Sequence, residues 1–316
     1  MAVVAIIFIV IIIGLIILNA LYKRTNAFQN QFIDITKFQS LKDEDCFDIV
    51  NLGSNHPKFA FDYSEAGVKG MNWAVGPQTF MYDFAILKKY KKHLNAGAKV
   101  IIPVCPLKFF LLDTQRNNLV KYYRVFSKHE MPNYDIKQKI SEYTLPVFRY
   151  PARVKRIIRD VGTDNKLSLT KNPMNKEQIA KDATFWIEGC WNPEFNIDVA
   201  NMTSLSKTNQ KSIEGNIRIL SEMIQYCLDN NLQPILTILP VTKELSSKFP
   251  ENFIQQNILR YINESNKHGI PVLNYLKDER FVSLDLYINS FFMNAVGRKY
   301  FTKIFINEMK NIEVGK

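Results

Sequence analysis

Residues 47–53 read FDIVNLG, residues 99–104 read KVIIPV, and residues 233–239 read QPILTIL. Each run is short and apolar and carries at most one charged residue, which is typical of strands buried on both faces of a parallel sheet. Helix-like runs lie between them, with apolar residues three and four positions apart at about 79–95 and 208–229. This alternation predicts an α/β fold, in which helices cover both faces of one parallel sheet.

The rest of the pattern completes this prediction. Two shorter strands are expected at 70–75 and 271–274, and two further helices at about 252–267 and 294–309. Gly97 is expected to end the first helix, because glycine commonly occupies that position. The sequence therefore predicts a three-layer αβα sandwich around a parallel five-stranded sheet.

The N-terminus is apolar and has no charged side chain. The stretch AVVAIIFIVIIIGLIILNALY (residues 2–22) would span roughly 30 Å as a helix, which is the hydrocarbon thickness of a bilayer. Cleavable signal peptides have a basic start and a shorter apolar run, so we expect a retained transmembrane anchor at 1–22. A juxtamembrane linker at 23–44 and an α/β domain at 45–316 are expected to follow.

Composition limits the partners and cofactors. The chain has 41 Lys and Arg against 30 Asp and Glu, a net charge of +11, which favours anionic partners such as lipid headgroups and acidic polymers. No zinc-knuckle, helix-turn-helix or aromatic RNA-binding signature is present, so nucleic acid is not an expected partner. The four cysteines are far apart and form no CxxC pair, and no phosphate-cradling or dinucleotide-binding motif occurs. We therefore expect no metal and no cofactor.

Residues 106–204 break the alternation of strands and helices. We interpret them as an insertion at the carboxyl edge of the sheet, where open α/β sheets bind ligands. The insertion contains a basic amphipathic stretch, FRYPARVKRIIRD (148–160), and an aromatic cluster, FWIEGCWNPEF (185–195). One interpretation is a solvated basic helix face beside a small satellite core. The other is a contact with a phosphorylated polymer or the membrane surface, in which Arg153 and Arg156 bind the ligand.

Three segments at the ends of predicted strands are informative together: NLGSNH (51–56), GMNWAVGPQTF (70–80) and INSFFMNAVGRKYFT (288–302). In order and spacing they resemble the SGNH/GDSL hydrolase superfamily. The likeness is to its membrane-anchored branch in bacterial surface-polysaccharide and teichoic-acid modification, which includes teichoic-acid D-alanylation proteins. The resemblance covers the chain from about Cys46 onward. It implies a flavodoxin-like sandwich with a site at the carboxyl ends of the strands.

In that superfamily a serine in a G-x-S turn attacks the acyl carbon, with a histidine as base and an aspartate that orients it. In this chain Gly53 matches the glycine, and Asn55 falls at the nucleophile position. Asn289 and Phe292 fall at the aspartate and histidine positions. The oxyanion-hole glycine falls near Gly76, which is followed by a proline without an N–H to donate. Asn and Phe do not titrate, so the resemblance implies a degenerate site that binds without triad hydrolysis.

The framework of the last segment is retained at Asn294, Gly297, Phe301 and Thr302. We expect a ligand-binding cleft formed by residues at the strand ends: Ser54, Asn55, His56, Gly76, Gln78, Asn289 and Asn294. Ser54 lies one residue before the nucleophile position, and His56 follows two residues later. Three roles of this turn stay open: hydrogen bonding within the turn, ligand binding, and catalysis by Ser54 with His56 or His129 as base.

Other polar residues are expected in structural roles. His93 and His268 are predicted to be solvated or to cap helices. Asp62 is predicted to be a turn residue, and Asp83 to lie on a helix surface. Cys227 falls on the apolar stripe of the 208–229 helix and is predicted to lie in the core.

Three functions from different classes fit these features. The first is an accessory factor that holds a glycan or polyol-phosphate chain during assembly or modification of a surface polysaccharide or teichoic acid. The second is an active carbohydrate O-acyl esterase or acyltransferase that uses Ser54. The third is a scaffold for an integral membrane acyltransferase or polymerase. All three place the domain on the extracytoplasmic side of the cell membrane, although Lys23 and Arg24 follow the anchor and the positive-inside rule favours the cytoplasm.

Overall fold

The computed structural model describes residues 2–112, 118–149, 151–160, 174–202 and 204–310. The chain forms two compact units. Residues 1–41 and 115–170 form the helical unit, and residues 42–114 and 171–316 form the sheet unit. Each unit contains a cluster of buried hydrophobic side chains of its own.

The sheet unit contains five strands, all parallel: β1 (Phe47–Asn51), β2 (Gly70–Asn72), β3 (Leu94–Pro103), β4 (Gln233–Ile238) and β5 (Val272–Asn274). Their order in the sheet is β2-β1-β3-β4-β5. The chain passes from β1 to β2 at one edge and then forms β3 on the other side of β1. The strand order therefore reverses between β1 and β3, and ligands of open α/β sheets bind outside the carboxyl ends of the strands at such a point.

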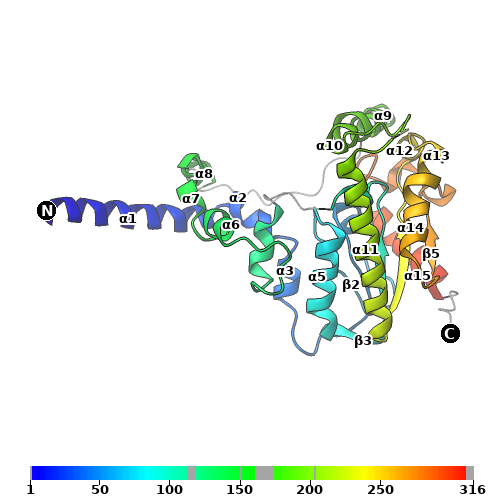
Figure 1. Ribbon diagram of the computed structural model, residues 1–316, viewed down its shortest axis with the longest axis horizontal. Helices are drawn as coiled ribbons and strands as arrows, with labels where there is room; N and C mark the ends of the chain where they lie inside the picture. Colours follow the sequence, from blue (N-terminus) through cyan, green and yellow to red (C-terminus); the bar gives the residue numbers. More distant parts are fainter. Residues whose placement is uncertain (1, 113–117, 150, 161–173, 203, 311–316) are drawn as a thin grey trace. The chain divides into compact units, whose positions relative to one another are not determined.

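Helices cover this sheet, which confirms the predicted α/β fold (Figure 1). The longer helices of the sheet unit are α5 (Phe80–Tyr90), α9 (Lys176–Thr184), α11 (Lys207–Asp229) and α15 (Ala295–Lys310). Its shorter helices are α4 (Asn55–Lys58), α10 (Asn192–Phe195), α12 (Lys243–Ser246), α13 (Glu251–Ile254) and α14 (Arg260–Ser265). A π-helical turn between α13 and α14 divides the single helix that was expected at 252–267.

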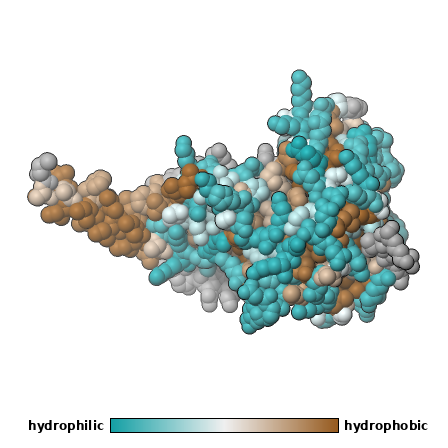
Figure 2. Space-filling view, turned by 60° about the horizontal axis from the view of Figure 1, so that its bottom comes forward, coloured by the Kyte–Doolittle hydropathy of each residue, from teal (hydrophilic) through white to brown (hydrophobic). Residues whose placement is uncertain are grey.

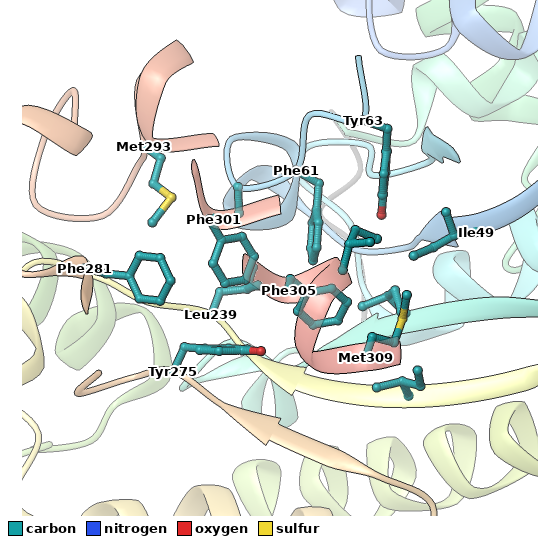
Figure 3. Packing of buried hydrophobic residues seen from close by; sticks show 14 of the residues in the cluster. Ile49, Phe61, Tyr63, Leu239, Tyr275, Phe281, Met293, Phe301, Phe305 and Met309 are labelled. Carbon is teal, nitrogen blue, oxygen red and sulfur yellow. The ribbon is translucent and has the colours of Figure 1, made fainter. Parts of the chain in front are cut away.

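One part of the core lies between α15 and the sheet (Figure 3). Phe301 and Phe305 of α15 pack in one cluster with Ile49, Ile101 and Ile235, which come from three neighbouring strands. On another side α11 packs against α5, α14 and β4. Cys227 of α11 is fully buried, as its place on the apolar stripe predicts.

The boundary between α5 and β3 differs from the prediction. The helix ends at Tyr90, a 3-10 turn follows, and β3 begins at Leu94. Gly97, which was expected to end the helix, lies inside β3 with a φ of +76°, and its N–H donates to the Asn231 carbonyl oxygen at 2.8 Å. Leu94 pairs with Phe47 of β1, and this long-range pairing has no signal in the local sequence.

The helical unit is built around the end of α1 (Ala2–Lys23). Its other helices are α2 (Asn26–Gln29), α3 (Thr36–Gln39), α6 (Ile136–Gln138), α7 (Pro146–Arg149) and α8 (Val154–Asp160). Tyr22 at the end of α1 packs with Phe28, Phe32, Val147 and Ile157 in a small core. The segment expected as a linker therefore contains helices and supplies two phenylalanines to this core.

The apolar part of α1 is long enough to cross a bilayer. The helix has 22 residues, its mean hydropathy reaches 3.3, and only 6% of its most apolar window is buried. Its exposed side chains form a continuous hydrophobic surface on the face shown in Figure 2.

The expected insertion at 106–204 is shared between the two units. Residues 115–170 belong to the helical unit, whereas 106–114 and 171–204 belong to the sheet unit. The basic stretch and the aromatic cluster of this insertion thus lie in different units.

Candidate functional site

A pocket of about 180 Å³ opens in the sheet unit where the strand order reverses, at the carboxyl ends of β1 and β3. Residues from three regions of the chain line it. The turn after β1 and the start of α5 contribute Ser54, Asn55, His56, Pro77 and Gln78; the turn after β3 contributes Cys105, Pro106, Leu107, Lys108 and Leu111; later segments contribute Trp186, Trp191, Glu194, Phe195, Phe291 and Phe292.

The turn after β1 depends on Gly53. Its φ is +114°, in a region that residues with a side chain rarely adopt, and a Cβ there would lie 2.5 Å from Cγ of Pro57. The Gly53 N–H donates to Oδ1 of Asp83 at 2.7 Å, and its carbonyl oxygen accepts from the Val75 N–H at 2.8 Å. Glycine is therefore required for the tight turn that presents Ser54, Asn55 and His56 to the pocket.

Asp83 and Lys108 form a buried ion pair beneath this turn. Nζ of Lys108 lies 3.0 Å from Oδ2 of Asp83, and the two side chains are 4% and 1% exposed. Nζ also donates to the Gln78 carbonyl oxygen at 2.8 Å, and the Gln78 side-chain amide donates to Asp83. The pair thus holds together the turn after β1, the start of α5 and the turn after β3.

The prediction that Asp83 lies on a helix surface is wrong. The carboxylate is buried because its partner Lys108, 25 residues later, is buried with it. A signal was present in the sequence: Asp83 lies three residues after Phe80 and four before Leu87, and therefore on the apolar stripe of α5.

His56 is buried and uses both of its ring nitrogens. Nε2 donates to the Pro240 carbonyl oxygen at 3.1 Å, because a carbonyl can only accept, and this leaves Nδ1 as an acceptor. Nδ1 lies 3.6 Å from Sγ of Cys105, within reach of the thiol proton, and the ring packs on Phe291 with centroids 4.3 Å apart. Burial lowers the pKa of His56 to about 4, so the imidazole is neutral at neutral pH.

Ser54 is held separately from this pair. Its Oγ accepts the backbone N–H of Gln78 at 3.0 Å. Among the described residues, His56 bonds to Pro240 and Cys105 and not to Ser54. The turn therefore brings the serine and the histidine to one pocket without joining them as nucleophile and base.

Asn55, which lines the pocket, is in close contact with Gly76, which does not line it. A Cβ on Gly76 would lie 1.6 Å from Oδ1 of Asn55, so only glycine allows this approach. The Asn55 amide lines the pocket at the position that the resemblance gives to the nucleophile.

The segment 288–302 supplies aromatic walls to the pocket rather than polar groups. Oδ1 of Asn289 accepts the backbone N–H groups of Phe291 and Phe292 at 3.0 and 2.7 Å, so Asn289 stabilises the turn. The Phe292 ring lines the pocket and packs on Phe59 with centroids 5.0 Å apart. Asn294 accepts the Gly297 N–H at 2.9 Å at the start of α15, and it does not line the pocket.

The aromatic cluster predicted in the insertion reaches this pocket. Trp186 and Trp191 lie on a π-helical segment after α9, with ring centroids 5.1 and 5.3 Å from Phe291. Asp182 of α9 fixes the facing turn, since it accepts the Ser290 backbone N–H at 3.0 Å and also the Ser290 hydroxyl. Sequence analysis found the tryptophans but missed Asp182, Cys105 and Lys108.

The two arginines proposed as ligand contacts lie in the helical unit. Arg153 donates to Oε2 of Glu142 at 2.9 Å and to the Pro146 carbonyl oxygen at 3.0 Å, so it stabilises this unit internally. Arg156 is exposed on α8. His129, the alternative base, is exposed in the same unit.

The two remaining histidines, His93 and His268, differ in burial. His93 is 3% exposed and its Nδ1 lies 2.8 Å from the Asp45 carbonyl oxygen, so the prediction of a solvated or capping role is wrong. His268 is exposed, as predicted. Oδ1 of Asp62 accepts from the Ser64 backbone and hydroxyl, which is the turn role expected for it.

The pocket suits binding better than acid–base catalysis. Burial raises the pKa of Cys105 to about 12, so this thiol is protonated beside a neutral imidazole. All four cysteines are free, and no group of three or more His, Cys, Asp or Glu residues in the described part of the chain could hold a metal ion. What remains is an apolar, aromatic pocket with a few convergent polar groups, the usual composition of a ligand site.

No protein-family model matches the chain, and no curated protein shows significant sequence similarity to it. The fold and the pocket are therefore the basis for a functional assignment.

Proposed function

We propose that this chain is a membrane-anchored, catalytically degenerate relative of the SGNH hydrolases. It binds a sugar or polyol segment of a cell-surface polymer in the pocket at the ends of β1 and β3, as an accessory factor in assembly or modification of that polymer. The observation that carries the proposal is the state of His56. Both of its ring nitrogens are occupied, and Phe292 fills the position that the resemblance gives to the base.

The walls of the pocket favour such a ligand. Trp186, Trp191 and Phe292 present ring faces and edges, on which the C–H groups of a sugar ring or polyol chain can pack. Asn55 lines the same pocket and carries an amide group suited to hydroxyl recognition. Buried aromatic area with few polar groups provides affinity and orientation without a proton-transfer group.

The apolar helix α1 supports a location at the membrane. If the ligand is a cell-surface polymer, the sheet unit lies on the extracytoplasmic side. Lys23, one of the two cations that favour the opposite topology, has a role within the fold. Its Nζ lies over the Tyr143 ring at 5.6 Å from the centroid. This cation therefore has a structural reason to follow α1, whichever side of the bilayer the unit occupies.

Labelling with a fluorophosphonate tests the absence of catalysis. The full chain in detergent micelles is treated beside a reactive control hydrolase, and adducts are located by peptide mass spectrometry. We expect no adduct at Ser54, because no base reaches its hydroxyl. An adduct that Ser54→Ala abolishes would replace this proposal with an active esterase or acyltransferase.

Calorimetric titration with a polyglycerol-phosphate polymer and with neutral surface glycans tests binding. We expect one of them to bind, and Trp186→Ala to weaken it by about tenfold, the usual effect of truncating a central aromatic contact. Phe185→Ala is the matched control, since that ring is adjacent in sequence, exposed, and outside the pocket lining. No binding by any of these polymers would favour the scaffold function instead.

A further inference from the structure

The end of α1 is built into the helical unit. Asn19 and Tyr22 are 6% and 4% exposed. The Asn19 amide donates to the Thr144 carbonyl oxygen at 3.1 Å and accepts the Val147 N–H at 3.4 Å. α1 also packs against α7 and α8, which lie beside its C-terminal end (Figure 1). The last turns of α1 are thus part of the packed core of the helical unit.

The exposed side of α1 continues into the part of the helix that packs in the helical unit. Ile17 and Leu21 are 54% and 40% exposed, although Asn19 and Tyr22 are buried. One side of the last turns of α1 therefore packs in the unit, while the other side stays apolar and exposed. α7 and α8 pack against this helix, so their exposed side chains flank the end of its apolar surface.

The surface of α7 and α8 suits that position. Phe148 on α7 is 44% exposed and Ile158 on α8 is 78% exposed. Ile157, the residue before Ile158 on α8, is buried in the core with Tyr22. This burial fixes the orientation of α8. Lys155 and Arg156 are exposed on the same helix, and Lys155 lies one turn before Ile158. An exposed apolar pair flanked by cations is the pattern of a segment that lies in a membrane interface.

We propose that α7 and α8 form an interfacial platform, which binds the surface of an anionic lipid bilayer. Phe148 and Ile158 enter the boundary between headgroups and acyl chains beside α1, and Lys155 and Arg156 bind lipid phosphates. This rests on the membrane span of α1 and not on polymer binding by the sheet unit. The platform fixes the orientation of the helical unit on the membrane.

A lipid surface fits better than a soluble phosphorylated polymer. A polymer site would need the cations alone, and two exposed apolar side chains beside them would only add to the apolar surface in water. A membrane surface binds both the apolar side chains and the cations. Each cation near anionic lipid raises the affinity for the surface about fivefold. Contact with α1 brings both sets to the bilayer.

Hydrogen–deuterium exchange of the full chain tests the platform. The chain is placed in nanodiscs of phosphatidylcholine and in nanodiscs that also contain phosphatidylglycerol. We expect α8 amides to exchange several-fold more slowly with the anionic lipid. Lys155→Gln/Arg156→Gln should remove the difference between the lipids, whereas Phe148→Ser/Ile158→Ser should speed exchange in both. The matched control, Lys207→Gln/Lys211→Gln, removes the same charge from exposed positions of α11 and should change neither.

Two results would overturn the proposal. One is exchange of α8 that is the same in both lipids and unchanged by the Lys155 and Arg156 substitutions. The other is protection of α8 by soluble polyglycerol phosphate in phosphatidylcholine nanodiscs without any effect of phosphatidylglycerol, which would assign the cations to a polymer. Polymer binding in the pocket is measured separately through the Trp186→Ala variant, so either proposal can fail while the other stands.

Discussion

At the scale of single residues, burial favours the neutral form of both Cys105 and His56. The pKa of the thiol rises to about 12 and the pKa of the imidazole falls to about 4. The contact of 3.6 Å between Sγ and Nδ1 is therefore a hydrogen bond between neutral groups. A nucleophilic cysteine needs the opposite, a thiolate beside a cation.

The first prediction concerns the reactivity of Cys105. Its pKa lies three units above the ordinary 9.0, so alkylation by iodoacetamide at neutral pH should be about a thousandfold slower than in the urea-unfolded chain. Peptide mass spectrometry of the time course measures the rate, and the unfolded chain is the control. Labelling of the folded chain at the unfolded rate, lost in His56→Gln, would reveal a thiolate–imidazolium pair and a nucleophilic site.

The second prediction concerns pH. The pKa of His56 is lowered from 6.5 to about 4 in the fold, so below pH 6.5 the unfolded chain binds a proton that the folded chain does not. Stability is complete above pH 6.5 and falls as the pH drops toward 4, by about 2 kcal/mol between pH 7 and pH 5 from this residue.

Urea unfolding of the full chain in micelles, followed by tryptophan fluorescence, measures this loss. All three tryptophans lie in the sheet unit, so the signal reports the unit that contains His56. His56→Gln should be destabilised less than the unsubstituted chain on going from pH 7 to pH 5. Equal losses in the two proteins would show that His56 is not buried as a neutral group.

At the scale of elements, the buried Asp83–Lys108 pair connects α5 with the turns after β1 and β3. Two charges in a low-dielectric interior stabilise a fold little, but removal of one leaves the other without a partner. The pair therefore specifies how these elements fit together at the floor of the pocket.

The third prediction follows from this pair. Lys108→Met should lower the free energy of unfolding by about 3–5 kcal/mol, because the Asp83 carboxylate stays buried without its cation. The double variant Asp83→Asn/Lys108→Met should recover part of the loss. The control is Lys92→Met, which removes an ion pair with Asp43 whose side chains are 65% and 91% exposed, and which should leave the urea midpoint unchanged. A midpoint for Lys108→Met equal to that of the control would contradict the role of the pair.

The strands could be predicted because a strand buried on both faces has a local signal. The runs before Gly53 and Cys105 are mostly apolar, with one charged residue each, and the structure places strands there. The start of β3 could not be predicted, because Leu94 becomes a strand residue only by pairing with Phe47. The site could also be predicted only in part. The turn of Ser54 to His56 is recognisable because it follows the end of a strand. The partners of His56 could not be predicted, because they are distant in the sequence and meet it only in the folded chain.

At the scale of the whole molecule, two units have separate buried clusters, and the chain passes from one to the other more than once. The expected linker at 23–44 has apolar residues four and three positions apart at Phe28, Phe32, Ile35 and Phe38, which is a helical signal, but the partners of Phe28 and Phe32 are contributed by residues as distant as Val120 and Val147. Such contacts are invisible to a reading of neighbouring residues. The apolar helix α1, by contrast, needs only length and composition to be predicted.

The fourth prediction tests whether the helical unit depends on the end of α1. Tyr22→Ala should destabilise that unit by about 3 kcal/mol or more, because the truncation opens a cavity among Phe28, Val147 and Ile157. Trypsin should then cleave after Lys121, which is 4% exposed in the intact unit, while the tryptophan transition of the sheet unit keeps its urea midpoint. Ile9→Ala is the control, since Ile9 is 54% exposed and its loss should not change cleavage. A shift of the tryptophan transition in Tyr22→Ala would instead show that the two cores unfold together, and that the end of α1 stabilises the pocket as well as the helical unit.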